Sequence, residues 1–493
     1  MHYVELFFVS GSDIWMLTTV IGCALFLLDD LFVDFFAFIK NTKAVKLSAT
    51  DMQNMLSLPE KKIGIMIANW HEAEIIERIV AGNIRGLKYT NYEVILGVYP
   101  NDFGTLAAAR SVEKKFKNVT VVVNTKDGPT SKGQMLNQMV NYIDSYNSSH
   151  IEEAFDVVLI QDSEDVIHPY SLKLMNRHAD SYDFIQVPVF SMDISLTKLT
   201  AGIYIDEFIE SHTKDLLVRD HFDAGLPSAG VGTAVTWRTV KKLLKLQNGE
   251  FLDEKTLTED YHLGLTCHDM GVKEHFACEY YEYKDENTGE RKVEYIATRE
   301  YFPQRIGQSI RQKTRWSLGI SLQGFEQRKW KSSSLGETYF LWRDRKGLIN
   351  APLFTSALIF TIYYVLAWFM TGAWPSLNYS PLNPVLTTFM WANLIFSVLR
   401  IANRISLVTA VYGFKVASLS PVRWLLSNFI NTASTYNAVY KWLSSKVRGD
   451  LPVWAKTDHI IPVGFGMDNK NMIEPDMTPI SISEDRLEAN SQM

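Results

Sequence analysis

The sequence predicts an α/β domain with a mostly parallel, Rossmann-like sheet, inserted between N-terminal and C-terminal transmembrane helices. Three observations support this fold class. Short apolar runs alternate with helical segments from about Lys61 onward, which is typical of a parallel sheet covered by helices on both faces. An acidic cluster directly follows one of these runs. Residues 347–399 contain no Asp, Glu, Lys or Arg, and two bilayer crossings of about 20 residues each with a short loop would fill such a stretch.

Composition narrows the class of protein. The chain of 493 residues is longer than one typical domain and can bury a large core. A net charge of -6 argues against a nucleic-acid-binding protein, which normally has a basic face. The three cysteines form no spaced metal motif and no disulfide framework, which indicates a reducing compartment: Cys23, Cys267 and Cys278.

Residues 1–45 are expected to form an N-terminal membrane helix. The apolar segment from Leu6 to Ile39 is too long for a signal peptide and has no basic start or small-residue cleavage site. Three lysines follow and would hold this end in the cytoplasm: Lys40, Lys43 and Lys46. Three carboxylates are costly in lipid, which leaves a helix lying on the membrane surface as the alternative: Asp29, Asp30 and Asp34.

A cytoplasmic domain is expected over residues 46–340. The predicted strands are 63–68, 94–99, 119–123, 157–160 and 183–188. The predicted helices are 72–84, 106–116, 133–146, 170–180 and 203–218. Because open α/β sheets bind ligands outside the carboxyl ends of their strands, the residues that follow these strands are the first candidates for a site.

The acidic cluster Asp162-Ser163-Glu164-Asp165 follows the most apolar predicted strand, Val157 to Ile160. Carboxylates packed this closely repel one another unless a cation neutralises them. Carboxylate oxygens are the ligands that Mg²⁺ and Mn²⁺ prefer. The cluster therefore predicts a divalent metal site, with a solvated acidic turn as the alternative.

Two further segments are candidates for the same site. Residues 225–234 form a glycine-rich loop whose spacing is neither the dinucleotide fingerprint nor a P-loop, so its glycines either admit a ligand or shape a turn. Thr258 is predicted to cap a helix with Glu259 and Asp260 in its first turn. The helix N-terminus favours ionised carboxylates, so Asp260 is a candidate proton acceptor, although acidic first-turn residues often only compensate the helix dipole.

The C-terminal part begins with an Arg-rich helix around residues 308–319 that also carries Trp316. It is either a basic membrane anchor or a diphosphate and sugar site. Residues 341–412 are expected to form a transmembrane pair with both basic flanks in the cytoplasm, the crossings being 348–371 and 385–399. Residues 413–468 are expected to form an interfacial helix and a return segment, and residues 469–493 a disordered tail.

Four motifs stand in one order along the chain: Trp70-His71-Glu72, Asp162-Ser163-Glu164-Asp165, Thr258-Glu259-Asp260 and Gln312-Lys313-Thr314-Arg315-Trp316. With membrane helices directly after the last motif, the set resembles the membrane-bound family 2 glycosyltransferases of the cellulose synthase and hyaluronan synthase type. Val231-Gly232-Thr233 and residues 452–459 are similar to the bacteriophage adsorption protein B group of that family. Larger members of this group carry a C-terminal domain that resembles cyclic-di-GMP sensors. This sequence ends before such a domain, which leaves regulation by that nucleotide open.

The resemblance implies a GT-A domain that transfers a sugar from a nucleotide donor, usually UDP-linked, with inversion at the anomeric carbon and with Mg²⁺ or Mn²⁺. It implies donor binding by Glu72, Asp102, Lys132, Asp162 and Arg315. It implies a metal bound by Asp162 together with Glu164 or Asp165. Asp260 takes the position of the general base, beside Glu259, and acceptor contacts fall on Gln312, Trp316, Gly232 and Thr233.

The implied setting is the bacterial inner membrane, with several crossings and a cytoplasmic catalytic domain that extends a glycan for exopolysaccharide synthesis. The implied partners are the nucleotide-sugar donor, the glycan acceptor, membrane lipid and an export or regulatory protein, but no nucleic acid. Two other functions stay open. The chain either adds a single sugar to a lipid carrier, or it is a non-enzymatic receptor or scaffold with a degenerate transferase domain.

Overall fold

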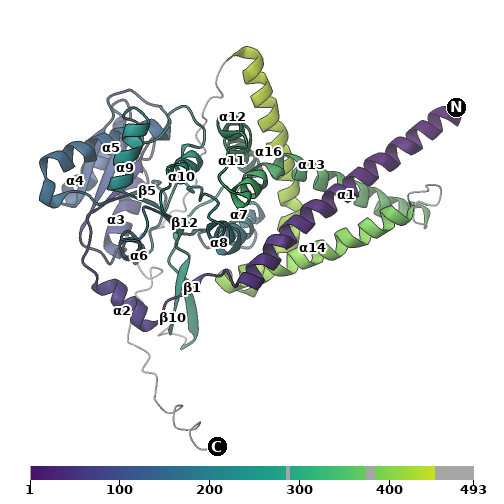
Figure 1. Cartoon of the computed structure of the whole chain (residues 1–493), viewed down its shortest axis with the longest axis horizontal. Helices are drawn as coiled ribbons and strands as arrows, with labels where there is room; N and C mark the ends of the chain where they lie inside the picture. The colour runs from purple at the N-terminus through teal and green to yellow at the C-terminus, as the bar shows by residue number, and fades with distance from the viewer. Residues whose placement is uncertain (1, 285–288, 373–382, 450–493) are drawn as a thin grey trace, which may run out of the picture.

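The computed structural model describes residues 2–284, 289–372 and 383–449, with side chains for 14–284, 289–372 and 384–449. Figure 1 shows an α/β domain attached to one end of a group of long helices. The N-terminus lies at the far end of that group. The predicted disordered tail and the motif at residues 452–459 lie outside the described residues.

A seven-stranded sheet forms the centre of the domain, in the order β4-β3-β2-β5-β8-β6-β9. Its strands are β2 (Ile63–Ala68), β3 (Tyr92–Val98), β4 (Val119–Val123), β5 (Val157–Gln161), β6 (Phe184–Gln186), β8 (Thr233–Thr236) and β9 (Glu274–Phe276). Every neighbouring pair is parallel except the two pairs made by β8, which is antiparallel to both β5 and β6. The predicted mostly parallel sheet is therefore confirmed.

Helices cover both faces of this sheet because its central strands are apolar on both sides. Val157 and Leu159 of β5 pack with the helices of one face, whereas Val158 and Ile160 pack with those of the other. The first face is covered by α3 (Ile76–Gly86), α4 (Phe103–Lys115) and α6 (Ser171–His178). The second is covered by α5 (Lys132–Ser149), α9 (Trp237–Leu246) and α10 (Glu259–Asp269). Strands buried on both faces form continuous apolar runs, which is the pattern of β2 and β5.

Two small sheets extend the domain towards the long helices. One has the order β1-β10-β11, from β1 (Val45–Lys46), β10 (Glu279–Lys284) and β11 (Arg291–Tyr295). The other pairs β7 (Val189–Ser191) with β12 (Thr298–Glu300) in parallel. The remaining domain helices are α2 (Ala49–Ser57), α7 (Leu199–Glu210), α8 (Leu216–His221), α11 (Ile306–Trp316) and α12 (Gly324–Arg328). The π-helical segment Ser211–Asp215 joins α7 to α8, and the π-helical segment Ser317–Gln323 joins α11 to α12.

In the part of the chain that the structure describes, three helices are long and apolar enough to cross a membrane: α1 (His2–Lys40), α13 (Leu335–Thr371) and α14 (Asn383–Tyr412). Membrane helices were predicted in all three places, although α13 begins before and α14 ends after the predicted crossings. The short α15 (Phe414–Ala417) and the long α16 (Ser420–Arg448) follow. Figure 1 shows α16 between the domain and the three long helices, across their direction. It packs against α7, α11 and α13, and its predicted position at a membrane interface stays a prediction.

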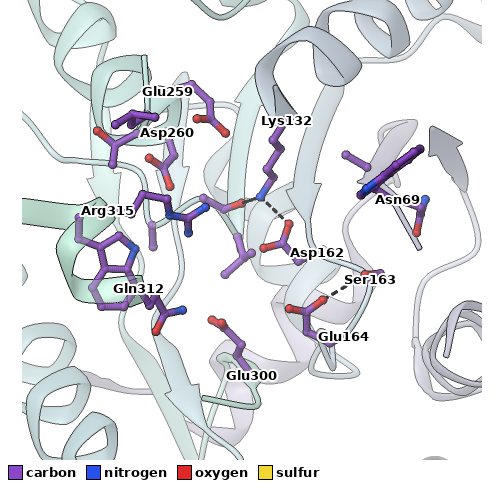
Figure 2. Close-up of a pocket in the computed structure, with 18 of the residues that line it drawn as sticks. Asn69, Lys132, Asp162, Ser163, Glu164, Glu259, Asp260, Glu300, Gln312 and Arg315 are labelled. Carbon is purple, nitrogen blue, oxygen red and sulfur yellow. Dashed lines mark hydrogen bonds and ion pairs between the residues drawn. The ribbon is translucent and has the colours of Figure 1, made fainter. Parts of the chain in front are cut away.

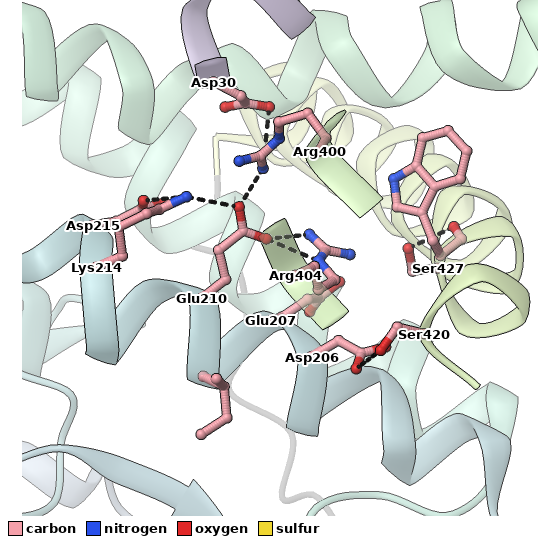
Figure 3. A network of polar contacts seen from close by, with 12 residues as sticks. Asp30, Asp206, Glu207, Glu210, Lys214, Asp215, Arg400, Arg404, Ser420 and Ser427 are labelled. Atoms are coloured by element: carbon pink, nitrogen blue, oxygen red, sulfur yellow. Dashed lines mark hydrogen bonds and ion pairs between the residues drawn. The ribbon is translucent and has the colours of Figure 1, made fainter. Parts of the chain in front are cut away.

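Asp29, Asp30 and Asp34 in the C-terminal part of α1 are paired, which explains how so apolar a helix accommodates them. Asp29 contacts Arg343 and Lys346, each at 2.5 Å, and Asp34 contacts Arg400 at 3.1 Å. The same cluster reaches the domain, where Glu210 at the end of α7 accepts hydrogen bonds from Arg404 (Figure 3). The carboxylates and basic side chains thus neutralise one another where the long helices meet the domain, as buried charges require.

Candidate functional site

A pocket opens at the carboxyl ends of β2 and β5 and is closed on its other side by α10 and α11. Figure 2 shows acidic and basic side chains pointing into it from both walls. Among the residues that line it are the predicted Glu72, Lys132, Asp162, Glu164, Glu259, Asp260, Gln312, Arg315 and Trp316. Segments far apart in the sequence therefore meet in one cavity, at the edge of the sheet where ligands of open α/β folds bind.

Asp162 and Lys132 form the central ion pair of the pocket. Asp162 directly follows β5, and Lys132 is the first residue of α5, whose N-cap Ser131 accepts a hydrogen bond from the Gln134 N–H. The Lys132 Nζ lies 2.5 Å from the Asp162 carboxylate and donates a hydrogen bond of 3.0 Å to the Gly230 carbonyl. Burial alone lowers the pKa of Lys132, but the Asp162 and Glu259 carboxylates outweigh it and hold that pKa above its usual value. Lys132 is therefore a permanent cation.

The two candidate metal ligands after Asp162 lie in different places. Glu164 lines the pocket, and the Ser163 hydroxyl donates to its carboxylate at 3.1 Å. Asp165 does not line the pocket, because its carboxylate turns back to accept the Asp162 N–H at 2.7 Å. Burial and the neighbouring carboxylates raise the pKa of Asp165 well above its usual value. This geometry supports Glu164 over Asp165 as a group that can face a cation.

Glu300, which sequence reasoning missed, points into the pocket from the end of β12. Burial, followed by the charges of Glu164 and Asp162, raises its pKa well above the usual value. Three carboxylates thus surround the same space. The only local signal was a charged residue ending a strand of three residues, and such a short strand has no detectable pattern.

Glu259 and Asp260 occupy the first turn of α10 and face the Lys132–Asp162 pair across the pocket (Figure 2). Burial raises the pKa of Asp260, while Lys132 and Arg315 oppose that shift. Burial and then the Asp260 charge raise the pKa of Glu259 to about 7. Burial thus favours the protonated form of both carboxyls, so the helix terminus does not by itself keep them ionised.

The N-terminus of α10 is packed closely by two neighbouring segments, and its N-cap differs from the prediction. Thr258 stands at the N-cap position, but its hydroxyl makes no capping hydrogen bond, so the predicted cap was wrong in this respect. The hydroxyl instead lies against Gly319, where an added Cβ would approach it to 2.5 Å. Gly230 has φ +80°, and a Cβ there would lie 2.5 Å from Asp260 Oδ2. A side chain at position 230 would therefore collide with the candidate base.

α11 supplies Gln312, Arg315 and Trp316 to the same pocket. Among the described residues, Gln312 Oε1 and Arg315 Nε are buried without a hydrogen-bond partner. Buried polar atoms are rarely left in this state, so both are suited to a ligand. The Arg315 guanidinium is a fork of donors of the type that binds phosphate oxygens. The helix is followed by the π-segment Ser317–Gln323, and such segments are frequent at functional sites.

The far end of the pocket is lined by Asn69, Trp70, Glu72 and Tyr99. Trp70 meets Tyr99 edge to face at 5.1 Å, and Asn69 Oδ1 has no hydrogen-bond partner among the described residues. Asp102 was also predicted for donor binding, but it does not line the pocket. Its carboxylate caps α4 through the Thr105 N–H and accepts the His71 N–H at 2.7 Å, so it positions the neighbouring loop.

Gly232 and Thr233, predicted to contact the acceptor, do not line the pocket either. Gly232 has φ +63° and donates its N–H to the Ile160 carbonyl at 3.0 Å. Thr233 begins β8, is fully buried, and donates its hydroxyl to Gln186 at 2.7 Å. Both residues join the glycine-rich loop to the sheet. The part of that loop that reaches the pocket is Ala229, Gly230 and Val231.

The pocket also fits a divalent cation. Asp162, Glu164 and Glu300 offer hard oxygen ligands, and the pKa of Glu300 is raised first by burial and then by the charges of Glu164 and Asp162. Among the described residues, however, these groups do not come together as three ligand atoms within 4.8 Å; a cluster elsewhere meets that criterion. The arrangement therefore suits an ion held by one or two carboxylates and completed by substrate phosphates, as is common for Mg²⁺.

Comparison with known proteins agrees with this geometry. Residues 59–319 match the family described as glycosyltransferase-like family 2. The chain is 35% identical over 456 residues to the bacteriophage adsorption protein B of Escherichia coli K12 and to the bacteriophage N4 adsorption protein B of Escherichia coli O157:H7. Each alignment covers 88% of this chain and 60% of the relative, so the chain spans well under two thirds of these relatives.

Among solved structures, the mannosyltransferase PcManGT of Pyrobaculum calidifontis, in complex with GDP-Man and Mn²⁺, has a similar fold. The TM-score is 0.52 at 12% sequence identity, and the likeness covers 86% of this chain and 99% of that one. At this identity the likeness bears on the fold alone, which is of the GT-A type.

Proposed function

Since the chain belongs to glycosyltransferase family 2, we propose that it transfers a sugar from a nucleotide donor to a glycan at a membrane surface, with inversion and with a divalent cation. UDP is the proposed nucleotide, and extension of an exopolysaccharide on the cytoplasmic side of the bacterial inner membrane is the proposed role.

One observation carries the proposal: Asp162 and Asp260, from distant segments, line the same pocket. Lys132 connects them, because its ammonium group pairs with Asp162 at 2.5 Å and holds the Gly230 carbonyl at 3.0 Å. Gly230 in turn lies directly against Asp260. A donor diphosphate beside Lys132 and Asp162 would thus be held a short distance from a carboxylate that can accept a proton.

The residues of the donor side suit a nucleoside diphosphate. Trp70 and Tyr99 offer aromatic surface for a base, and the Asn69 carbonyl oxygen is available to accept a hydrogen bond from it. Lys132 and Arg315 supply the positive charge that a diphosphate leaving group requires. A divalent cation held by Asp162 and Glu164 would neutralise further negative charge on the leaving group.

The opposite wall suits the attacking hydroxyl. Asp260, ionised, would accept the proton of the acceptor hydroxyl as that oxygen bonds to the anomeric carbon and the bond to the diphosphate breaks. One base is sufficient for a single displacement with inversion, whereas a double displacement with retention needs a nucleophile. Gln312 and Trp316 lie beside Arg315 and are proposed to hold the acceptor sugar.

A screen of nucleotide sugars for Mg²⁺- or Mn²⁺-dependent nucleotide release by the purified chain tests this function. One donor is expected to give release that a chelator abolishes and that Asp162→Asn removes. A chain that is folded but releases nucleotide from no donor and binds none would contradict the proposal and favour a receptor or scaffold. Product length separates the two enzymatic functions, since single-sugar transfer to a lipid carrier yields no polymer.

A further inference from the structure

Outside the pocket, His178, His275 and Glu279 form a compact cluster in which one ligand atom of each lies within 4.8 Å of the others. His178 ends α6, His275 is the middle residue of the edge strand β9, and Glu279 begins β10. None of the three lines the catalytic pocket. We propose that this cluster binds one zinc-like transition-metal ion, which fastens the edge of the central sheet to α6 and to the small sheet.

The chemistry of the three side chains favours such an ion over Mg²⁺ or Ca²⁺. Two imidazole nitrogens and one carboxylate oxygen make a donor set that suits Zn²⁺ and its neighbours, whereas Mg²⁺ and Ca²⁺ prefer oxygen ligands. The same set with an open fourth position is known from zinc sites. Here that position can be filled by water, because the His275 side chain is 24% exposed.

The orientation of His275 is set by a carboxylate outside the cluster. Its Nδ1 lies 3.2 Å from Asp220 Oδ2, which also accepts the Phe276 N–H at 3.3 Å. An imidazole that donates through Nδ1 keeps the lone pair of Nε2 for a metal, and carboxylates hold metal-binding histidines in this way. Tyr182 stacks on the same ring at 4.5 Å between centroids and an angle of 19°, which restricts its rotation.

The other two ligands already meet. His178 Nε2 and Glu279 Oε1 are 2.5 Å apart, and the second Glu279 oxygen lies 3.4 Å from Arg177. Zn²⁺ bonds of about 2.0–2.2 Å in a tetrahedron place ligand atoms about 3.3 Å apart. Side-chain rotations that move the ligand atoms by about 1 Å would therefore complete the site. The ion would replace the proton shared by His178 and Glu279, which would leave to solvent. Arg177 would keep its contact with the second oxygen.

Metal titration of the full chain in detergent, purified without a polyhistidine tag and stripped with a chelator, tests this site. The parent is expected to bind one equivalent of Zn²⁺, to release protons on binding, and to unfold at a higher temperature with zinc. His178→Ala and His275→Ala should remove that equivalent. Asp220→Asn should weaken binding by about 10- to 100-fold, because it removes the group that orients His275.

Two controls keep the result specific. His150→Ala should bind zinc like the parent, because His150 stands at the C-cap of α5, outside the cluster. Asp162→Asn should also keep the equivalent, which separates this site from a catalytic cation. X-ray absorption of the zinc-loaded parent should show two imidazoles and does not depend on the variants being folded. The proposal would be overturned if the parent bound no stoichiometric zinc, if the zinc had only oxygen ligands, or if both histidine variants bound zinc as the parent does. The cluster would then be only a histidine–glutamate ion pair.

Discussion

Replacing Asp260 by Asn is the most direct test of the proposed chemistry, because it removes a proton acceptor and almost nothing else. The amide keeps the size of the carboxylate and can still accept the Tyr261 N–H, which lies 2.7 Å from Asp260 Oδ1. The Lys132–Asp162 pair is untouched. A positioned base contributes about 10²- to 10⁴-fold to a rate, so kcat should fall by that factor while donor affinity changes little. Nucleotide release measures the first quantity and calorimetry with UDP the second.

The pH dependence gives this prediction a second readout. Burial raises the pKa of Asp260, and burial with the Asp260 charge raises that of Glu259 to about 7. A base works only when it is deprotonated, so kcat/KM of the parent should climb with rising pH, and the climb should lie above the usual pKa range of an aspartate because burial raises the pKa of Asp260. Glu259→Gln should keep this climb, because burial and not the Glu259 charge is the main cause of the raised pKa of Asp260.

Three results would refute this reasoning. Parental turnover by Asp260→Asn would exclude Asp260 as the base. Loss of activity in Glu259→Gln, with activity kept in Asp260→Asn, would transfer that role to Glu259. Loss of UDP binding in Asp260→Asn, in a chain whose thermal unfolding is unchanged, would place Asp260 on the donor side of the pocket.

Three further variants test the walls of the site and the attachment of the domain to the long helices. Gly230→Ala should abolish transfer because its Cβ would lie 2.5 Å from Asp260. The control Gly249→Ala is also at positive φ but has nothing within 4 Å of the added Cβ, so it should only lower the free energy of unfolding by about 1–2 kcal/mol. Activity assays and unfolding curves of both variants test this difference. Arg315→Lys should raise the KM for the donor about tenfold or more, since a charge-assisted hydrogen bond is worth about 1.5–3 kcal/mol, and an unchanged KM would exclude Arg315 from the diphosphate. Arg400→Ala should lower the free energy of unfolding in detergent by about 3–5 kcal/mol, because it removes a buried cation that contacts Asp30, Asp34 and Glu210 at once; a loss below 1 kcal/mol would contradict this.

The parts of the fold that were predictable are those with strong local patterns. The predicted strands 63–68 and 119–123 coincide with β2 and β4, because their apolar runs have clear ends. The long uncharged stretch likewise predicted the helices α13 and α14. Three residues that the motifs singled out, Asp162, Glu259 and Arg315, all line the pocket, and their roles there stay predictions. Each of these signals lies within one segment and needs no knowledge of its neighbours.

What could not be predicted depends on contacts between distant segments. β7 and β12 have three residues each and exist because they pair with each other, so neither has a pattern of its own. Glu300 follows from that pairing, and its place in the pocket was therefore hidden. Asp102 carries a carboxylate that could bind a ligand, but it serves as the N-cap of α4. The carboxylates of α1 looked costly in lipid because their cations lie on α13 and α14, hundreds of residues away.

The same contacts argue that the domain and the long helices form one structural unit, although the sequence suggests a boundary near residue 340. Lys313, beside the proposed acceptor residues, lies 2.6 Å from Glu207 of α7 and donates to Asn431 of α16 at 2.8 Å. Asp206 of α7 and Arg423 of α16 form a pair that is almost completely buried. A domain cut off at residue 340 would keep Asp206 but lose its partner Arg423, and Lys313 would keep Glu207 but lose Asn431. The unpaired buried charge of Asp206 would be strongly destabilising. The helix that carries Arg315 is thus held in place by α16, so the geometry of the pocket depends on the helices that follow it.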